Sequence, residues 1–261
     1  MKIFSEKVFL LITGASQGIG EQIAKSFAPL LPANSQILLL ARNGESLNRV
    51  KQQLPDNLVI NTVSVDLSSS SAEDLTEIFR NNVKEENISL FSEAIIIHNA
   101  GSLGNITQKT NDMLDFDVMR KYYDLNVFSP AVLNNVFMKF FNGHVKNKIF
   151  VINITSLCAI EPMKSMGYYC SGKSAREMFF KVFAKENPHV NVLNYSPGPV
   201  KTEMFHDVCQ NVGDFEVKEN FNELNVKNTV LTTQQTVNRL LTVLEEQKYS
   251  SGDHVDYYDS L

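Results

Sequence analysis

Short apolar runs recur along the chain, and their pattern constrains the fold more than any other feature of the sequence. The runs are rich in Leu, Ile and Val. They are apolar on successive residues instead of alternating, as in strands buried on both faces of a parallel sheet. Stretches long enough for helices separate them. This alternation predicts an α/β fold with a doubly wound parallel sheet, in a single domain over residues 1–261. The expected strands are Val8–Ile12, Ile37–Ala41, Leu58–Val65, Ala94–Ile97, Ile149–Ile152 and Val190–Leu193.

Helices are expected between and after these strands. The long stretch Asp115–Phe141 contains Pro130, which has no amide hydrogen and should interrupt or kink a helix. Near the C-terminus, Val255–Tyr258 is expected to form a final edge strand. The other expected helices are Gly20–Leu30, Glu45–Leu54, Ala72–Val83 and Thr233–Glu246.

One segment lacks a clear period. From Pro197 to about Lys227 the chain carries charges, Asn residues and short apolar fragments. In open α/β sheets, ligands bind at the carboxyl ends of the strands, and this segment follows such an end. We therefore expect a substrate lid at about residues 199–227. The alternative is a disordered surface insertion.

Composition and charge exclude several classes of protein. A net charge of −5 gives no electrostatic footprint for nucleic acid, and the apolar runs are too short to span a membrane. Glu6 and Lys7 break the first apolar stretch, so no targeting segment is expected. The cysteines, Cys158, Cys170 and Cys209, are odd in number and lack metal-ligand spacing. This pattern predicts free thiols in a reducing compartment, no metal site and a cytoplasmic protein.

The first expected strand runs directly into a glycine-rich loop that precedes an expected helix. The glycines allow the backbone to turn tightly and to approach a pyrophosphate, whose charge is favoured by the helix N-terminus. The spacing G-x3-G-x-G also occurs in ordinary strand-to-helix turns. Its place in the order of elements favours a dinucleotide site of the Rossmann type. The residues expected at the cofactor here are Gly14, Ser16, Gln17, Gly18, Ile19 and Gly20.

The ends of the next two strands bear on the choice of nucleotide. After the second strand comes Arg42-Asn43, where NAD-binding folds have a carboxylate for the ribose 2′-hydroxyl. The Arg42 guanidinium suits a 2′-phosphate, so the predicted cofactor is NADPH/NADP+, although a solvated surface Arg is the alternative. Asp66-Leu67 follows the third strand. There, Asp66 could accept a hydrogen bond from the adenine amino group or act as a cap or turn residue.

Tyr169 and Lys173 stand four residues apart on an expected helix and therefore share one face. A cation beside a phenol stabilises the phenolate and lowers a pKa that is otherwise about 10. The same pair occurs by chance in many helices. Tyr168 is adjacent, but Gly172 and not a Lys lies four residues beyond it.

Two further polar residues occupy unusual places. Ser156 follows the strand Ile149–Ile152, where its hydroxyl could bind a substrate carbonyl or cap a helix. Asn126 falls inside the long expected helix, a position that its propensity disfavours. A bond to a local carbonyl or a functional kink would explain it.

Together these residues resemble the short-chain dehydrogenase/reductase family across nearly the whole chain. His98 stands where the family often has Asn, and we expect no effect on the chemistry. The pattern comprises Thr13 to Gly20, Asn99-Ala100-Gly101, Asn126, Ser156, Tyr169, Lys173 and Pro197-Gly198, in the family's order and spacing.

The resemblance implies specific roles for the site residues. Tyr169 would donate a proton to the substrate oxygen, and Ser156 would bind that oxygen. Lys173 would lower the pKa of Tyr169 and bind the nicotinamide ribose, and Asn126 would hold a water that relays protons. A homodimer is also implied, with Asp115–Phe141 as a candidate interface. The further cofactor contacts implied are Asn43, Leu67, Asn99, Ala100, Gly101, Tyr169, Pro197, Gly198, Val200 and Thr202.

Other segments resemble a branch of the family that reduces ketones on pterin side chains. The resemblance implies that Asp256 accepts hydrogen bonds from the amino-pyrimidine edge of a pterin. Leu157, Gly198, Ser156 and Tyr169 would complete the substrate site. The implied reaction converts 6-pyruvoyl-tetrahydropterin to a tetrahydrobiopterin. The alternatives are a reductase of a non-pterin ketone and a non-enzymatic NADPH-sensing protein on the same fold. The matching segments are Leu40 to Asn43, Asn99 to Gly104, Ser156 to Ala159, Tyr169 to Met178, Leu193 to Pro199 and Ser251 to Asp259.

Overall fold

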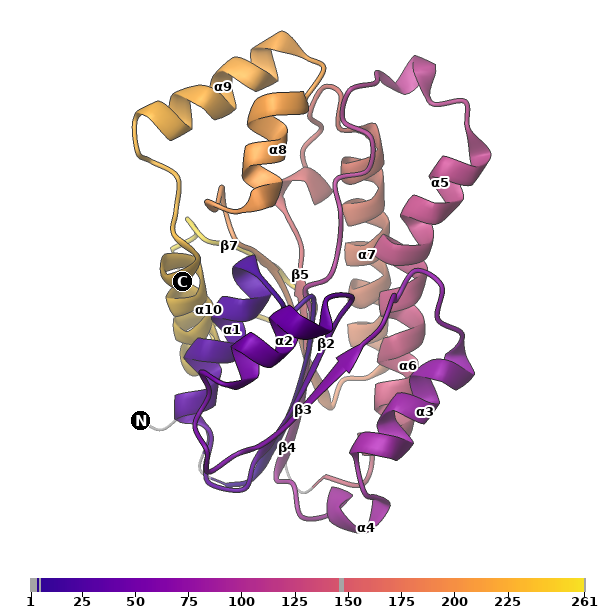
Figure 1. The fold of residues 1–261 in the computed structure, drawn as a ribbon, viewed down its shortest axis with the longest axis vertical. Helices are drawn as coiled ribbons and strands as arrows, with labels where there is room; N and C mark the ends of the chain where they lie inside the picture. Colours follow the sequence, from indigo (N-terminus) through magenta and orange to yellow (C-terminus); the bar gives the residue numbers. More distant parts are fainter. Residues whose placement is uncertain (1–3, 5, 146–147, 261) are drawn as a thin grey trace.

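A computed structural model describes residues 4, 6–145 and 148–260. Seven parallel strands form one sheet, in the order β3-β2-β1-β4-β5-β6-β7 (Figure 1). This arrangement confirms the predicted doubly wound α/β sheet. The strands are β1 (Val8–Thr13), β2 (Gln36–Ala41), β3 (Val59–Ser64), β4 (Glu93–His98), β5 (Lys148–Ile154), β6 (Val190–Ser196) and β7 (His254–Asp256).

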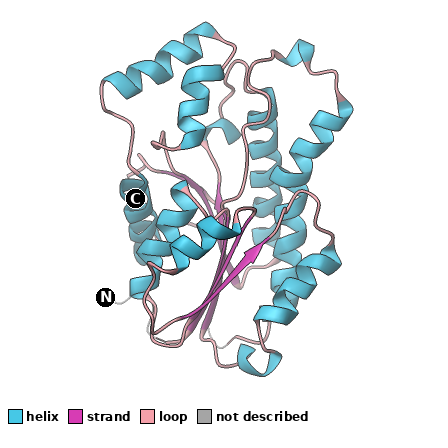
Figure 2. Cartoon of the chain, in the orientation of Figure 1, coloured by secondary structure: helices cyan, strands magenta, loops and turns pink. Residues whose placement is uncertain are grey.

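Helices cover both faces of the sheet (Figure 2). Apolar side chains of α1 (Gly18–Phe27), α2 (Gly44–Lys51) and α10 (Thr233–Glu246) share one buried cluster with the strands. Those of α3 (Ala72–Asn82), α6 (Ser129–Phe141) and α7 (Gly167–Glu186) share the cluster on the other face. The remaining helices of the described residues are α4 (Glu85–Ile88), α5 (Phe116–Tyr123), α8 (Glu203–Asn211) and α9 (Phe215–Val226).

Burial along the strands follows their place in the sheet. Every residue of β1 and β2 is buried, as their continuous apolar sequences predict. In β3, by contrast, both terminal residues are exposed and those between are only partly buried. The expectation of burial on both faces is therefore wrong for β3, because it lies at the edge of the sheet. Polar residues such as Asn61 and Thr62 are tolerated at such an edge.

The stretch predicted as one long helix is divided. A π-helical segment, Asp124–Phe128, separates α5 from α6. Pro130 lies in the first turn of α6, where its missing amide hydrogen removes no bond within that helix. The interruption that Pro130 predicts is thus present, and it lies just before the proline and contains Asn126.

The segment without clear period is helical, and the alternative of a disordered insertion is wrong. It forms α8 and α9, which Thr202 and Asp214 cap by accepting bonds from Phe205 N and Val217 N. A bridge joins Val200, near the start of the segment, to Leu231, which lies just beyond its end. In Figure 1, α8 and α9 stand beyond one end of the sheet. We call α8 and α9 with their connecting residues the α8–α9 lobe.

No helix among the described residues combines the length and the apolar character needed to cross a lipid bilayer.

Candidate active site

The glycine-rich loop at the end of β1 is fixed by contacts with the end of β4. Asn99 donates hydrogen bonds from Nδ2 to the carbonyl oxygens of Thr13, at 3.1 Å, and Gly14, at 3.2 Å. Thr13 Oγ1 in turn accepts from the backbone N–H groups of Asn99 and Ala100, at 3.0 Å each. A Cβ atom at Gly20 would lie 2.2 Å from the Gly14 carbonyl oxygen, so this close approach requires glycine.

The loop has the properties of a pyrophosphate site. Gly14 and Gly18 adopt φ angles of 66° and 59°, which favour glycine. Helix α1 begins after Gln17, whose side chain forms no cap hydrogen bond, so the first N–H groups of α1 stay available to an anion. Thr202 lies beside Gly18, since a Cβ there would be 3.5 Å from Thr202 Cγ2. Ser16 and Ile19 are partly buried in the same loop.

The residues expected around the adenosine lie at the ends of β2 and β3. Arg42 is exposed, and its charge helps to lower the pKa of Asp66, although hydrogen bonds from Ser68 contribute more. Asn43 caps α2, accepting from Ser46 N at 2.9 Å. Leu67 is buried in the core. Arg42 and Asp66 are thus available to a nucleotide, whereas Asn43 and Leu67 have evident structural roles.

Asn126 connects the π-helical segment to the turn after β4. Its Oδ1 accepts from Ser102 N at 2.8 Å, and its Nδ2 donates to the carbonyl of Tyr122 at 2.8 Å. A Cβ at Gly101 would lie 3.0 Å from Asn126 Oδ1. The bond to a local carbonyl and the helix irregularity therefore occur together. The neighbouring His98 is buried, which lowers its pKa to about 3, so the ring is neutral at ordinary pH.

Ser156, Tyr169 and Lys173 meet where β5 ends beside α7. Lys173 is buried, and its Nζ donates to the Ile154 carbonyl at 2.7 Å and lies 5.6 Å from the centroid of the Tyr169 ring. Ser156 Oγ accepts from Cys158 N at 3.2 Å, which caps a short 3-10 turn. The Ser156 hydroxyl also acts on Tyr169, where it lowers the pKa of the phenol. The structure thus shows the cap and the contact with Tyr169 together.

The electrostatics of Tyr169 differ from the sequence-based expectation. Burial raises the pKa of the Tyr169 phenol above its ordinary value, and the charge of Cys158 acts in the same direction. The Ser156 hydroxyl and the charge of Arg176 oppose that rise without outweighing it. Burial also lowers the pKa of Lys173 well below its ordinary value, as does the charge of Arg176. Desolvation disfavours the charged form of Lys173. The lowering of the Tyr169 pKa that the sequence predicts is therefore smaller than the rise caused by burial.

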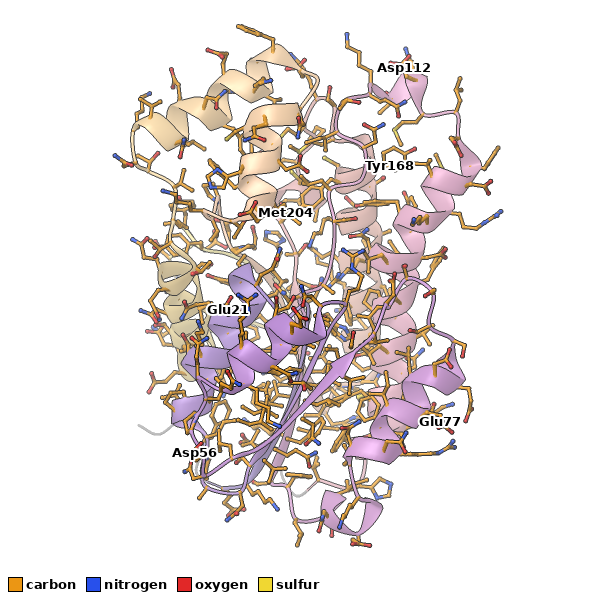
Figure 3. The ribbon with its side chains drawn as sticks, viewed as in Figure 1. Glu21, Asp56, Glu77, Asp112, Tyr168 and Met204 are labelled. Carbon is orange, nitrogen blue, oxygen red and sulfur yellow. The ribbon has the colours of Figure 1, made fainter. Side chains whose placement is uncertain are left out.

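The two adjacent tyrosines have different surroundings. Tyr168 is buried and packs on Tyr122, with ring centroids 5.4 Å apart. Gly172 permits this packing, since a Cβ there would lie 2.6 Å from the Tyr122 hydroxyl. Tyr169 is only partly buried, and its hydroxyl lies 4.0 Å from Met204 Sδ in α8. Figure 3 labels Met204 on α8 and the adjacent Tyr168 on α7. The α8–α9 lobe therefore reaches the Tyr169 hydroxyl.

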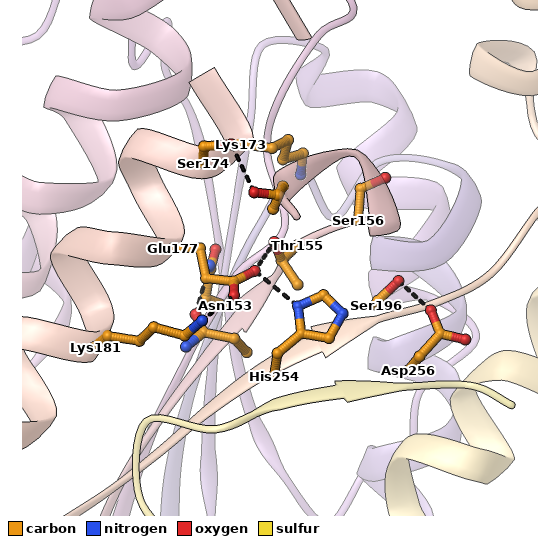
Figure 4. A network of polar contacts seen from close by, with 12 residues as sticks. Asn153, Thr155, Ser156, Lys173, Ser174, Glu177, Lys181, Ser196, His254 and Asp256 are labelled. Carbon is orange, nitrogen blue, oxygen red and sulfur yellow. Dashed lines mark hydrogen bonds and ion pairs between the residues drawn. The ribbon is translucent and has the colours of Figure 1, made fainter. Parts of the chain in front are cut away.

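Asp256 is the last residue of β7, so it lies at the carboxyl end of the sheet, as Ser156 does. It pairs in register with Ser196 of β6, which donates a hydrogen bond to Asp256 Oδ2 at 2.5 Å (Figure 4). Its Oδ1 accepts from Tyr258 N at 3.1 Å. Gly198 follows β6 with a φ of 71°, and Leu157 follows β5 with an exposed side chain. Pro197 and Val200, the other residues expected at this end, are buried.

A cavity of about 840 Å³ lies beside this constellation. Cys158 and Cys170, the sequence neighbours of Leu157 and Tyr169, contribute to its lining, as do Met163 and Asp214. Ser156, Tyr169, Lys173 and Asn126 do not line it. The cavity is therefore distinct from the residues predicted to take part in the reaction.

The sequence-based reasoning missed a buried polar layer beneath the site. Arg176 Nε donates to Asn153 Oδ1 at 2.6 Å, and its two terminal nitrogens donate to the carbonyls of Ala100 and His98. Glu177 accepts from Thr155, His254 and Lys181. A signal was available, since Arg176 and Glu177 lie three and four residues after Lys173 and must share its helix face.

Comparisons with known proteins agree with this geometry. A family model described as short chain dehydrogenase matches residues 8–213. Sepiapterin reductase of Bos taurus is 32% identical over 257 residues, covering 97% of this chain and 95% of that protein. Benzil reductase ((S)-benzoin forming) of Bacillus subtilis is 28% identical over 241 residues, covering 90% of this chain and 93% of that protein.

A solved structure shows the same likeness in three dimensions. A short chain dehydrogenase/reductase from Saccharomyces cerevisiae superposes with a TM-score of 0.82 at 25% identity, covering 97% of this chain and 96% of that one. The family resemblance drawn from the sequence is thereby confirmed. The chain belongs to the short-chain dehydrogenase/reductase family and is a nicotinamide-dependent oxidoreductase acting on CH–OH and C=O groups.

Proposed function

We propose that this chain is an NADPH-dependent reductase of pterin side-chain ketones, similar to sepiapterin reductase. The observation that carries the proposal is the extent of the likeness to that enzyme. The family model ends at residue 213, whereas the alignment with the Bos taurus enzyme covers 97% of the chain and therefore extends far beyond that residue. The likeness includes much of the substrate end, where family members with different substrates would be expected to diverge.

The cofactor would be held by the loop and strand ends described above. The backbone of Gly14 to Gly20 and the start of α1 would bind the pyrophosphate, with Thr202 beside them. Arg42 would bind a 2′-phosphate, which favours NADPH over NADH. When bound, the cofactor supplies a hydride to the carbonyl carbon of the substrate.

Tyr169 would complete the reduction by donating its phenolic proton to the substrate oxygen. Its raised pKa keeps the phenol protonated before the reaction. Ser156, whose hydroxyl already influences the pKa of Tyr169, would bind the same oxygen and stabilise its developing charge. Lys173 would bind the nicotinamide ribose, and Asn126 would hold a water that returns a proton towards Tyr169 through Lys173.

The substrate end would recognise the pterin ring. Asp256 would accept hydrogen bonds from the amino-pyrimidine edge, with Leu157 and Gly198 lining the site and the α8–α9 lobe closing over it. The physiological reaction would convert 6-pyruvoyl-tetrahydropterin to a tetrahydrobiopterin. Sepiapterin, reduced to dihydrobiopterin, is the convenient test substrate.

Asp256→Asn tests the proposal at its most specific point. The amide presents an N–H group to a ligand edge that also donates, so we expect KM for sepiapterin to rise about tenfold or more. NADPH affinity and turnover of benzil, which has no amino-pyrimidine edge, should be unchanged. Asp253→Asn, an exposed position in the same tail, is the matched control. An equal change with sepiapterin and benzil, or no change with either, would contradict pterin recognition by Asp256.

A second candidate is a carbonyl reductase of a non-pterin diketone. The likeness to the Bacillus subtilis benzil reductase, which covers 90% of the chain, favours it. Under this alternative benzil is turned over, sepiapterin is inert, and Asp256→Asn leaves benzil turnover unchanged.

We also infer a homodimer that forms through the outer face of α5 to α7. Phe128, Met178 and Val182 are exposed apolar side chains on this face. Light scattering of the purified chain should give twice the monomer mass, and Met178→Glu should shift it towards monomer. A monomeric parent chain would contradict the inference. The reducing, cytosolic location stays a prediction from the cysteines, which are all free.

A further inference from the structure

Glu177 is a buried carboxylate on α7, one helical turn beyond Lys173, and it joins three parts of the molecule. Its side chain is 3% exposed. Its Oε2 accepts from Thr155 Oγ1 at 2.7 Å and from His254 Nδ1 at 2.9 Å, while Oε1 pairs with Lys181 Nζ at 2.6 Å. Figure 4 shows this carboxylate between the end of β5 and strand β7. One group thus links α7 to both strands.

Both bonded segments, the residues after β5 and strand β7, carry a residue of the proposed substrate site. Thr155 immediately precedes Ser156. His254 lies two residues before Asp256 in β7, so their side chains point to the same face of the sheet. A shift of the Glu177 carboxylate would therefore change the placement of Ser156 relative to Asp256.

The same segments are also tied through β6. Thr155 N donates to the Tyr195 carbonyl at 2.9 Å, and Ser196 donates to Asp256. The backbone pairing of β5 with β6 and of β6 with β7 fixes the spacing of the three strands. The Glu177 contacts add side-chain links from α7 to Thr155 and to His254 in β7.

The Glu177 side chain is negatively charged, which strengthens the hydrogen bonds that it accepts. Burial alone would raise its pKa, but hydrogen bonds from His254, Lys181 and Thr155 outweigh burial and lower the pKa to about 2. The group is therefore a carboxylate throughout the ordinary pH range. Hydrogen bonds to an ionised acceptor are shorter and stronger than neutral ones, which makes this connection stiff.

The preceding residue provides a contrast on the same helix. Arg176 bonds the carbonyls of His98 and Ala100, in the turn expected at the cofactor, and Asn153 in β5. Glu177 instead bonds Thr155, His254 and Lys181, none of which belongs to that turn. Adjacent charges on α7 thus face the cofactor side and the substrate side separately.

We propose that Glu177 is a positioning residue for the substrate, which sets the distance between Ser156 and Asp256 through Thr155 and His254. The inference rests on the proposed function, in which Asp256 holds the pterin ring while Ser156 holds the ketone. A substrate bound at both points depends on that distance. A small ketone held only at Ser156 does not.

The test measures Glu177→Gln with NADPH and two substrates, sepiapterin and benzil. The amide keeps the shape of the side chain and removes its charge. We expect KM for sepiapterin to rise about tenfold, with little change in kcat. KM for NADPH and kcat/KM for benzil should stay at the parent values. Glu186→Gln, the same change at an exposed position on α7, is the control and should leave every constant unchanged.

Circular dichroism shows whether Glu177→Gln is folded. If it is not, a milder variant tests the same inference. Thr155→Val removes one donor to Glu177 and retains the shape of the side chain. It should give the same selective rise in KM for sepiapterin, about threefold to fivefold.

The outcomes separate this inference from the proposed function. If Asp256→Asn impairs sepiapterin turnover selectively while Glu177→Gln and Thr155→Val affect both substrates equally or neither, the positioning role is refuted and the proposed function stands. If the parent chain reduces benzil but not sepiapterin, the proposed function fails and this inference fails with it.

Discussion

The nucleotide end and the substrate end of the site are built in different ways. At the nucleotide end, Gly14, Gly20 and Asn99 are held by close contacts that involve the backbone, and a single added Cβ would meet a carbonyl oxygen at 2.2 Å. At the substrate end, Ser156 and Asp256 are linked through side chains, and the carboxylate of Glu177 is central to that link. Close backbone contacts tolerate few substitutions, whereas the residues of a side-chain network can be substituted one at a time. A family can therefore keep one cofactor and acquire many substrates.

The largest effect on activity is expected from Tyr169→Phe. This variant separates the chemical step from binding at the nucleotide end. Removing the phenolic proton should lower kcat about 10²–10⁴-fold, because general acid catalysis contributes that much. NADPH affinity, measured by fluorescence titration, should be unchanged, since the nucleotide end is intact. A variant that retains the parent kcat would show that another group supplies the proton.

A smaller effect is expected at the nucleotide end from Arg42→Ala. Loss of a charge-assisted bond to a 2′-phosphate should weaken NADPH binding about 10- to 100-fold and leave NADH binding unchanged. Arg49→Ala, an exposed arginine on the following helix, is the control. If NADPH and NADH weaken equally, Arg42 does not read the 2′-phosphate.

Acid titration of stability tests the side-chain network of the substrate end. The pKa of Glu177 is lowered from an ordinary 4.5 to about 2, so its contribution is fully present above pH 4.5 and is lost as pH falls towards 2. Allowing for screening by solvent, this corresponds to roughly 2 kcal/mol. Urea unfolding between pH 5 and pH 2 should therefore show a shallower loss of stability in Glu177→Gln than in the parent. Equal slopes would mean that Glu177 is not held ionised.

The smallest effect is expected from Asn43→Ala. Because Asn43 accepts from Ser46 N, its loss should lower the free energy of unfolding by about 1 kcal/mol through the missing helix cap. NADPH affinity should fall much less than in Arg42→Ala. A large loss of affinity with unchanged stability would instead make Asn43 a nucleotide contact.

The sequence predicts the strand, the loop and the helix of the proposed nucleotide end because these parts are contiguous. Strand β1, the glycine loop and α1 follow one another, so propensity and spacing identify them directly. Helix α10 has the predicted bounds for the same reason, since Thr232 and Gln235 form a capping box before its apolar face.

The α8–α9 lobe was harder to predict. Its helices are short, and the polar character of α9 hides any strong period. The caps Thr202 and Asp214 were the available signals. The exposure of β3 was missed for a different reason: an apolar run indicates a strand but does not show whether that strand lies at the edge of the sheet.

The Glu177 network could not be predicted from spacing. Thr155 and His254 lie 22 and 77 residues from Glu177 in the sequence, and only the fold brings them together. The adjacent charges of Arg176 and Glu177 on the helix face of Lys173 indicated burial of polar groups, but they did not identify the partners.

The most direct test of the account is the rate of NADPH oxidation by the purified chain with sepiapterin, run beside NADH and beside benzil. The account predicts rapid turnover of sepiapterin with NADPH and weak turnover with NADH. Reduction of benzil alone would keep the fold and the chemistry of Tyr169 but contradict pterin recognition at Asp256.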